Sequence, residues 1–252
     1  MCGRYAITSA PEAIRRLFGY EGNPNFPPRY NVAPTQPVPI VRLAEGKRQF
    51  ALVRWGLIPA WVKDPRGFSL LINARGESLT DKPAFRNAMR YRRCLFPADG
   101  FYEWRRAGER KTPYCVRLKS GGPMAFAGLW ESWMGPNGEE LETAAIVTTR
   151  ANRALAAIHD RMPVIVEPDA FDFWLDSRKV DATTAAALVT PAREGVLDVY
   201  EVSPAVNRAE NDTPALIEPV TAAPARADAG PPAGKEASAR KGKPDSRQGS
   251  LF

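Results

Sequence analysis

The chain has 252 residues, 44% hydrophobic and 25% charged, as in ordinary globular proteins, and no apolar run is long enough for a signal region or a bilayer span. We therefore expect a cytoplasmic protein without a membrane partner, and its three scattered cysteines and one histidine argue against a disulfide framework or a metal site. The net charge of +7, with arginines clustered at 86–93 and 105–111, suits a polyanionic partner such as nucleic acid, although a merely basic, soluble surface has the same composition.

Strand patterns dominate residues 1–218, which read as one continuous domain. Runs of β-branched and aromatic residues are bounded by turn residues along this part of the chain. Helix signals are fewer, and strands and helices do not alternate regularly, which favours a mixed or antiparallel sheet. We predict a single α+β domain built on a barrel-like sheet with short flanking helices. The predicted strands are 38–43, 50–58, 69–74, 94–97, 101–105, 114–118, 124–130, 143–149, 163–166 and 196–202, and the predicted helices are 11–18, 83–90, 152–158, 168–175 and 182–188.

The first predicted helix carries a capping signal. Ser9 stands just before Pro11 and is followed three residues later by Glu12, which is the spacing of a capping box. We therefore expect the Ser9 side chain to bond the first turn of this helix.

The composition changes abruptly at residue 219. From 219 to 249 the chain is built mainly of Ala, Pro, Gly, Lys, Arg and Ser, and Val220 is its only large aliphatic residue. Such a segment cannot bury enough apolar surface to offset its chain entropy. We predict that residues 219–252 form a disordered basic tail.

The last residues of this tail have a different character. Gln248, Leu251 and Phe252 resemble the short peptide by which bacterial proteins dock on the replication sliding clamp. Two apolar anchors fill a groove, the glutamine fixes the register, and a flexible tether gives reach. The sliding clamp is therefore a candidate partner, and the alternative is a random apolar terminus.

Cys2 stands directly behind the initiator methionine. Removal of Met1 leaves a free α-amine and a thiol on neighbouring carbons. The amine condenses with an aldehyde to a Schiff base, and the thiol then closes a five-membered thiazolidine. An α-amine has a reference pKa of about 7.7–8.0, which leaves a neutral fraction at physiological pH. The alternative is a cysteine that is there by chance or for packing.

Two further polar groups break the apolar pattern. His159, at a junction of helix and strand, is the side chain whose ordinary pKa is nearest neutrality, although lone histidines are more often structural. Asn73, Arg75 and Glu77 follow an apolar strand, and a period of two places them on one face. That face can bind a sugar-phosphate edge or can simply be an exposed polar surface.

Glu103 lies between Tyr102 and Trp104 in an aromatic strand. Apolar surroundings raise the pKa of a carboxyl group towards acid–base use, whereas pairing with an arginine is the more usual outcome. Tryptophans are core residues by default, but an exposed Trp104 near arginines can stack on a base.

Seven segments in order resemble the SOS-response-associated peptidase family, whose members process abasic sites and crosslink to them in single-stranded DNA. The resemblance covers residues 1 to about 210. The matching segments are 1–5 (MCGRY), 30–36 (YNVAPTQ), 55–59 (WGLIP), 72–77 (INARGE), 93–104 (RCLFPADGFYEW), 127–131 (AGLWE) and 158–163 (IHDRMP).

The resemblance implies a role for each matching residue. Cys2 is the nucleophile through both amine and thiol, and Asn73 positions the open sugar and the amine. Glu103 relays protons, and His159 assists ring opening. We expect four residues to contact DNA: Arg4, Arg75, Trp104 and Arg161.

The resemblance also implies lyase activity and self-removal of Met1, with Cys2 and Glu103 involved. We expect a monomer without cofactor, which is nucleoid-associated when bound to DNA. Two other functions stay open. One is an amidohydrolase of the glutaminase type, which also uses a processed N-terminal cysteine. The other is a non-catalytic module that binds single-stranded DNA.

Overall fold

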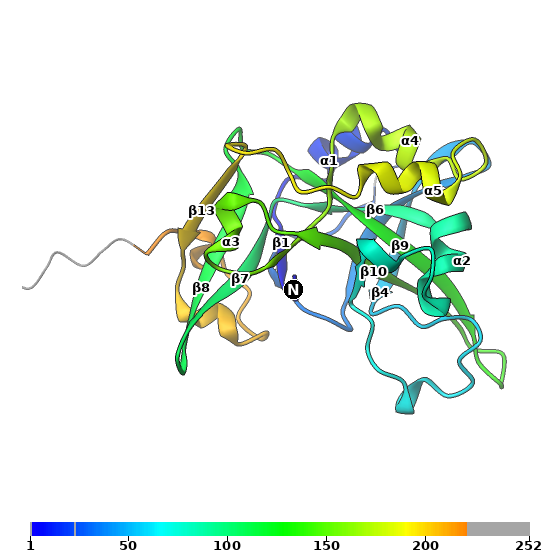
Figure 1. Cartoon of the computed structure of the whole chain (residues 1–252), viewed down its shortest axis with the longest axis horizontal. Helices are drawn as coiled ribbons and strands as arrows, with labels where there is room; N and C mark the ends of the chain where they lie inside the picture. The colour runs from blue at the N-terminus through cyan, green and yellow to red at the C-terminus, as the bar shows by residue number, and fades with distance from the viewer. Residues whose placement is uncertain (1, 23, 221–252) are drawn as a thin grey trace, which may run out of the picture. The chain divides into compact units, whose positions relative to one another are not determined.

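A closed ring of five strands lies at the centre of the computed structural model, which describes residues 2–22 and 24–220 (Figure 1). Strands β4 and β10 are parallel, and the other neighbours in the ring are antiparallel. This mixed sheet confirms the predicted α+β, barrel-like class. The ring runs in the order β10 (Glu140–Arg150), β4 (Lys47–Trp55), β3 (Pro37–Ala44), β6 (Arg93–Ala98) and β9 (Met124–Met134).

Eight further strands extend this ring and build a second sheet. Strands β5 (Asn73–Arg75) and β11 (Arg161–Pro163) pair with β10, and β12 (Ile165–Val166) pairs with β9. The second sheet is antiparallel throughout. Its order is β13 (Leu197–Glu201), β8 (Arg110–Leu118), β7 (Gly100–Ala107), β1 (Tyr5–Ile7) and β2 (Arg29–Val32).

Aromatic side chains join the two sheets. Tyr5 of β1 is fully buried, and its ring meets Trp55 edge-on at 5.3 Å between centroids and Phe126 at 6.2 Å. Gly128 of β9 lies directly against Phe96 of β6, because a Cβ there would lie 2.5 Å from the ring of Phe96. The N-terminal strand is therefore fixed to the barrel by packing as well as by hydrogen bonds.

Short helices cover the barrel. In Figure 1, α1, α4 and α5 lie together, and the rings of Phe18 in α1 and Phe171 in α4 stack at 5.1 Å. Among the described residues, no helix is long and apolar enough to span a membrane. The helices are α1 (Pro11–Phe18), α2 (Pro83–Tyr91), α3 (Arg153–Ala156), α4 (Phe171–Leu175) and α5 (Ala182–Ala185).

Several sequence predictions need correction at the level of elements. Strands β1 and β2 are not among the predicted strands, and residues 69–72 are not in a strand. Glu77 does not continue the face of Asn73 and Arg75, because the strand ends at Arg75 and Glu77 lies in a 3₁₀ helix at Gly76–Ser78. Of the predicted tail, residues 221–252, including the terminal peptide, lie outside the described part of the chain.

The predicted capping box is wrong. Ala10 is the N-cap of α1 and makes no side-chain cap bond. The Ser9 hydroxyl and the Ser9 N–H (2.8 Å) both donate to the carboxylate of Asp99, and Glu12 pairs with Arg15 at 2.8 Å. A carboxylate that accepts charge-assisted hydrogen bonds competes well with the helix N–H groups for the serine.

The arginine cluster at 86–93 was interpreted as suited to a polyanionic partner, and this interpretation is wrong for Arg93. Its side chain is buried, and its guanidinium donates to the carbonyls of Trp174, Met89 (3.0 Å) and Val180 (2.7 Å). Burial lowers the pKa of Arg93 to about 10, so the group stays charged at neutral pH. Arg93 therefore joins α2, β6 and α4 and is not available to a polyanion.

We expect Arg93→Lys to lower the free energy of unfolding by about 2–3 kcal/mol. A single ammonium cannot reach three carbonyls that diverge around a planar fork, so at least one buried acceptor loses its partner. Chemical denaturation measures the change, with the exposed Arg90→Lys as control. Equal stability of the two variants would show that the fork of Arg93 does not hold these elements.

Candidate active site around Cys2

The pairing of β1 with β7 brings the start of the chain to Glu103. Tyr5 stands opposite Phe101, and the Tyr102 N–H donates to the carbonyl of Arg4 at 3.0 Å. Continued in the same antiparallel register, the chain has Gly3 opposite Glu103. Cys2 is therefore placed beside this carboxyl group by backbone hydrogen bonds.

Cys2 is fully buried. Burial raises the pKa of its thiol well above the ordinary value, and the negative charge of Glu103 raises it further. The thiol therefore keeps its proton at neutral pH and can deliver that proton when the sulfur forms a bond.

Asn73 also holds the backbone of Cys2. It is the first residue of β5, which pairs with β10, and its Nδ2 donates to the Cys2 carbonyl at 2.9 Å. The indole of Trp55 donates to the carbonyl of Ile72 at 3.0 Å and so fixes the approach to this strand. The Oδ1 of Asn73 is buried and has no hydrogen-bond partner among the described residues. An acceptor is thus available next to Cys2.

Glu103 is a buried carboxyl group in the middle of β7, only 2% exposed. Burial raises its pKa from 4.5 to about 7. Both protonation states are consequently populated near neutral pH, which suits a group that gives and takes a proton in one reaction.

His159 reaches the site from the turn between α3 and β11. Its Nδ1 accepts the N–H of Arg161 at 3.0 Å and lies 3.0 Å from a carboxylate oxygen of Asp160. Burial is the largest cause that lowers the pKa of His159. The ring is therefore largely neutral at pH 7 and can accept a proton.

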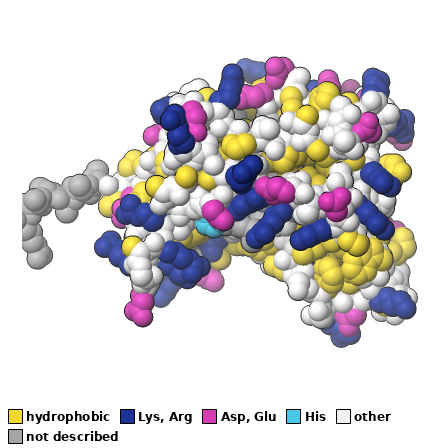
Figure 2. All heavy atoms as spheres, viewed as in Figure 1, with side chains coloured by type: hydrophobic (Ala, Val, Ile, Leu, Met, Phe, Trp, Pro, Cys, Tyr) yellow, Lys and Arg dark blue, Asp and Glu magenta, His cyan; other side chains and the backbone are white. Residues whose placement is uncertain are grey.

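Glu103 and His159 line one pocket of about 480 Å³, together with Trp104 and Asn207. The indole of Trp104 donates to Oδ1 of Asn207 at 2.7 Å, which fixes the ring in the pocket wall. Figure 2 shows the single histidine, in cyan, on this face, with Lys and Arg side chains beside it over β7 and β8. Asn207 could not be predicted from the sequence, because it lies about a hundred residues from Glu103 in a segment without a motif.

The three predicted arginines differ in what they contact. Arg4 donates to Oδ1 of Asn31 at 2.7 Å and to the Val206 carbonyl at 2.9 Å. Arg161 is 8% exposed and forms a bidentate pair with Glu77 at 2.6 and 2.9 Å. Arg75 is exposed at the end of β5 and has no ion pair among the described residues. Arg75 is thus the one of the three whose charge is open to a phosphate in this arrangement.

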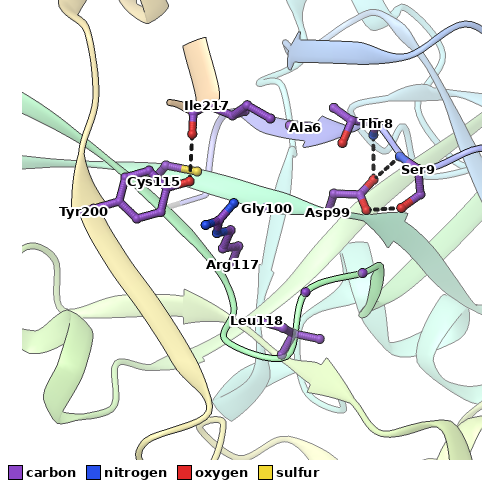
Figure 3. Close-up of a pocket in the computed structure, with 12 residues that line it drawn as sticks. Ala6, Thr8, Ser9, Asp99, Gly100, Cys115, Arg117, Leu118, Tyr200 and Ile217 are labelled. Atoms are coloured by element: carbon purple, nitrogen blue, oxygen red, sulfur yellow. Dashed lines mark hydrogen bonds between the residues drawn. The ribbon is translucent and has the colours of Figure 1, made fainter. Parts of the chain in front are cut away.

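A second cavity, of about 280 Å³, lies on the same sheet but holds none of the predicted catalytic residues (Figure 3). Its polar groups already fix neighbouring segments. Asp99 accepts the Thr8 N–H at 2.5 Å, and the Tyr200 hydroxyl donates to the Ile217 carbonyl at 2.7 Å. Of the two cavities, the one of about 480 Å³ therefore holds the predicted acid–base residues Glu103 and His159.

The chain is similar to known proteins over most of its length. The family model for the SOS response associated peptidase (SRAP) matches residues 1–209. The chain is 39% identical over 222 residues to the abasic site processing protein YoqW of Bacillus subtilis, which covers 86% of this chain and 99% of that protein. It is 30% identical to the abasic site processing protein HMCES of Xenopus tropicalis over 85% of this chain and 77% of that protein.

Solved structures share the fold. A crystal structure of a Bacteroides thetaiotaomicron protein superposes with a TM-score of 0.79 at 24% identity, covering 87% of this chain and all of that chain. A phage-related protein of Bordetella bronchiseptica superposes with a TM-score of 0.64 at 32% identity, covering 80% and 94%. The chain belongs to the SOS response associated peptidase family.

Glu103→Gln should remove a stability penalty that grows with pH. Below pH 4.5 the carboxyl group is protonated in the folded and unfolded states, and no penalty exists. As the pH rises to about 7, only the unfolded chain loses the proton, so the wild type becomes less stable. The stability gained by the variant should therefore increase by roughly 3 kcal/mol between pH 4 and pH 8.

Denaturation at the two pH values measures this gain, with Glu109→Gln at the exposed hairpin tip as control. A gain for Glu103→Gln that stays constant with pH would contradict a raised pKa at this position.

Proposed function

We propose that the protein processes abasic sites in single-stranded DNA and crosslinks to them through Cys2 after removal of Met1. The observation that carries the proposal is the placement of the Cys2 backbone between Asn73, which binds its carbonyl, and Glu103, whose pKa is about 7. The names of the relatives YoqW and HMCES support the same substrate.

The proposed reaction begins with opening of the abasic sugar. His159 accepts the proton of the C1′ hydroxyl and passes a proton to O4′ as the bond between C1′ and O4′ breaks. The product is an aldehyde at C1′. A neutral imidazole is the form required, and the lowered pKa of His159 supplies it.

The amine of Cys2 then attacks C1′ to give a carbinolamine. Glu103 in its acid form protonates the carbinolamine hydroxyl, which leaves as water, and a Schiff base remains. The sulfur of Cys2 adds to C1′, and the thiol proton goes to the nitrogen. The net change is a thiazolidine and one molecule of water.

We further propose that residues 1–218 form the catalytic and DNA-binding domain, with Trp104 as a surface for a base beside the pocket. The same buried carboxyl group and nucleophile can serve the self-removal of Met1, and the crosslinking site can support lyase chemistry. Glutamine hydrolysis stays the rival reaction, and ammonia release from glutamine would favour it.

Cys2→Ala, and a form that retains Met1, should give no stable adduct with abasic single-stranded DNA, because ring closure needs the amine and the thiol together. Cys2→Ser should give at most a less stable link. Denaturing gel electrophoresis measures the adduct, and the matched control is Cys94→Ala, which removes a buried thiol of the barrel. A wild-type level of adduct in Cys2→Ala would refute the proposed linkage.

Glu103→Gln and His159→Ala should slow adduct formation by about 10²–10⁴-fold, because each removes a positioned proton transfer. Affinity for undamaged single-stranded DNA should change much less. Single-turnover kinetics and fluorescence anisotropy separate the two effects. The roles are misassigned if the variants bind weakly but react at the normal rate once bound.

We also propose that the terminal peptide with Gln248, Leu251 and Phe252 binds the bacterial sliding clamp, which would concentrate the protein at replicated single strands. Titration of a labelled peptide 243–252 with purified clamp should show saturable binding. Replacement of both Leu251 and Phe252 by Ala should abolish it, because two apolar anchors are lost. Unchanged binding of that variant would exclude this partner.

A further inference from the structure

Two cations face each other across the hairpin of β7 and β8. Arg106 stands directly opposite Lys111 in the antiparallel register, and both side chains are exposed. Like charges in directly opposed positions destabilise a strand pair. Neither side chain has an ion pair or a hydrogen bond within the described part of the chain, so no carboxylate there offsets the repulsion.

The same two residues line the pocket that holds Glu103 and His159. The other cations of the hairpin are placed differently. Arg105 lies over the ring of Tyr114 at 5.1 Å, and Arg110 stands opposite Ala107. Residues on alternate strand positions point to opposite faces, so Arg105 and Arg110 share the face of Glu103, but neither of them lines the pocket. Within this hairpin, the uncompensated charge at the pocket comes from one cross-strand pair.

We propose that Arg106 and Lys111 form a binding site for one phosphodiester group of the DNA strand next to the abasic nucleotide. This inference rests on the proposed function and adds a phosphate contact on the hairpin side of the pocket, in addition to Arg75. The planar fork of Arg106 suits two phosphate oxygens, and Lys111 adds a point charge. A bound phosphate also relieves the repulsion between the two cations.

The test uses undamaged single-stranded DNA and the Cys2→Ala background, so that only non-covalent binding is measured. Arg106→Gln with Lys111→Gln should flatten the slope of log affinity against log salt by about 0.7, the contribution of one phosphate. The matched control, Arg105→Gln with Arg110→Gln, removes the same charge from two hairpin residues that do not line the pocket and should flatten the slope less. Thermal melting checks that both variants fold.

A methylphosphonate scan then locates the phosphate. Oligonucleotides with one neutral linkage at successive positions around a single abasic analogue are bound to the wild type and to the double variant. At one position the neutral linkage should weaken binding by the wild type but leave binding by the Arg106/Lys111 variant unchanged, as for two changes that remove the same interaction.

Three outcomes would overturn the inference. The hairpin site is refuted if the pocket pair and the control pair flatten the salt slope equally. It is also refuted if every methylphosphonate weakens the wild type and the pocket variant alike, or if the wild type does not bind DNA. Adduct formation with abasic DNA is measured separately, so its absence would refute the proposed function without deciding the phosphate contact.

Discussion

The insertion of β1 between β2 and β7 is the constraint on which the candidate site depends. Chain termini ordinarily fray unless they are tied into the fold. Here the backbone of Arg4 and Tyr5 pairs with β7, the Tyr5 ring packs on Trp55, and the Arg4 guanidinium binds Asn31 and the Val206 carbonyl. Chemistry at the α-amine of Cys2 requires an N-terminus whose position is as fixed as that of a core residue.

A second consequence of this placement is electrostatic. The fold buries Glu103 where its charge is costly, which raises its pKa to about 7 and makes the folded state less stable at neutral and alkaline pH. The same desolvation keeps the thiol of Cys2 protonated and the imidazole of His159 neutral. One structural cause thus sets all three groups in the forms that the proposed reaction uses.

Much of the fold could be predicted from alternation and turn residues, because most of the strands are long and have a buried face. The short β1 and β2 offered too few residues for a periodic signal, and Ser9 was misassigned because its partner Asp99 is distant in the chain. Charge counting could not separate Arg93, which is bound by three buried carbonyls, from Arg106, which lies at a pocket. Burial and tertiary partners, which composition does not contain, decide the role of an arginine.

The candidate site, like the fold, could be predicted from the sequence only in part. Its motifs could be found in the sequence because each is a local pattern, and the resemblance to the family gave each residue a role. The sequence could not show that Asn73 binds the Cys2 carbonyl, that Arg161 is held by Glu77, or that Asn207 closes the pocket wall. These contacts depend on the pairing of β5 and β11 with the same strand, β10, and on the position of the sheet that carries β7.

Intact-mass spectrometry of the protein after reaction with abasic single-stranded DNA, before and after borohydride treatment, tests the central claim most directly. The account predicts a mass equal to the Met1-free protein plus the DNA minus one water, unchanged by borohydride because a thiazolidine has no reducible imine. An adduct that retains Met1, or one that gains two hydrogen atoms on reduction, would contradict a linkage through both the amine and the thiol of Cys2.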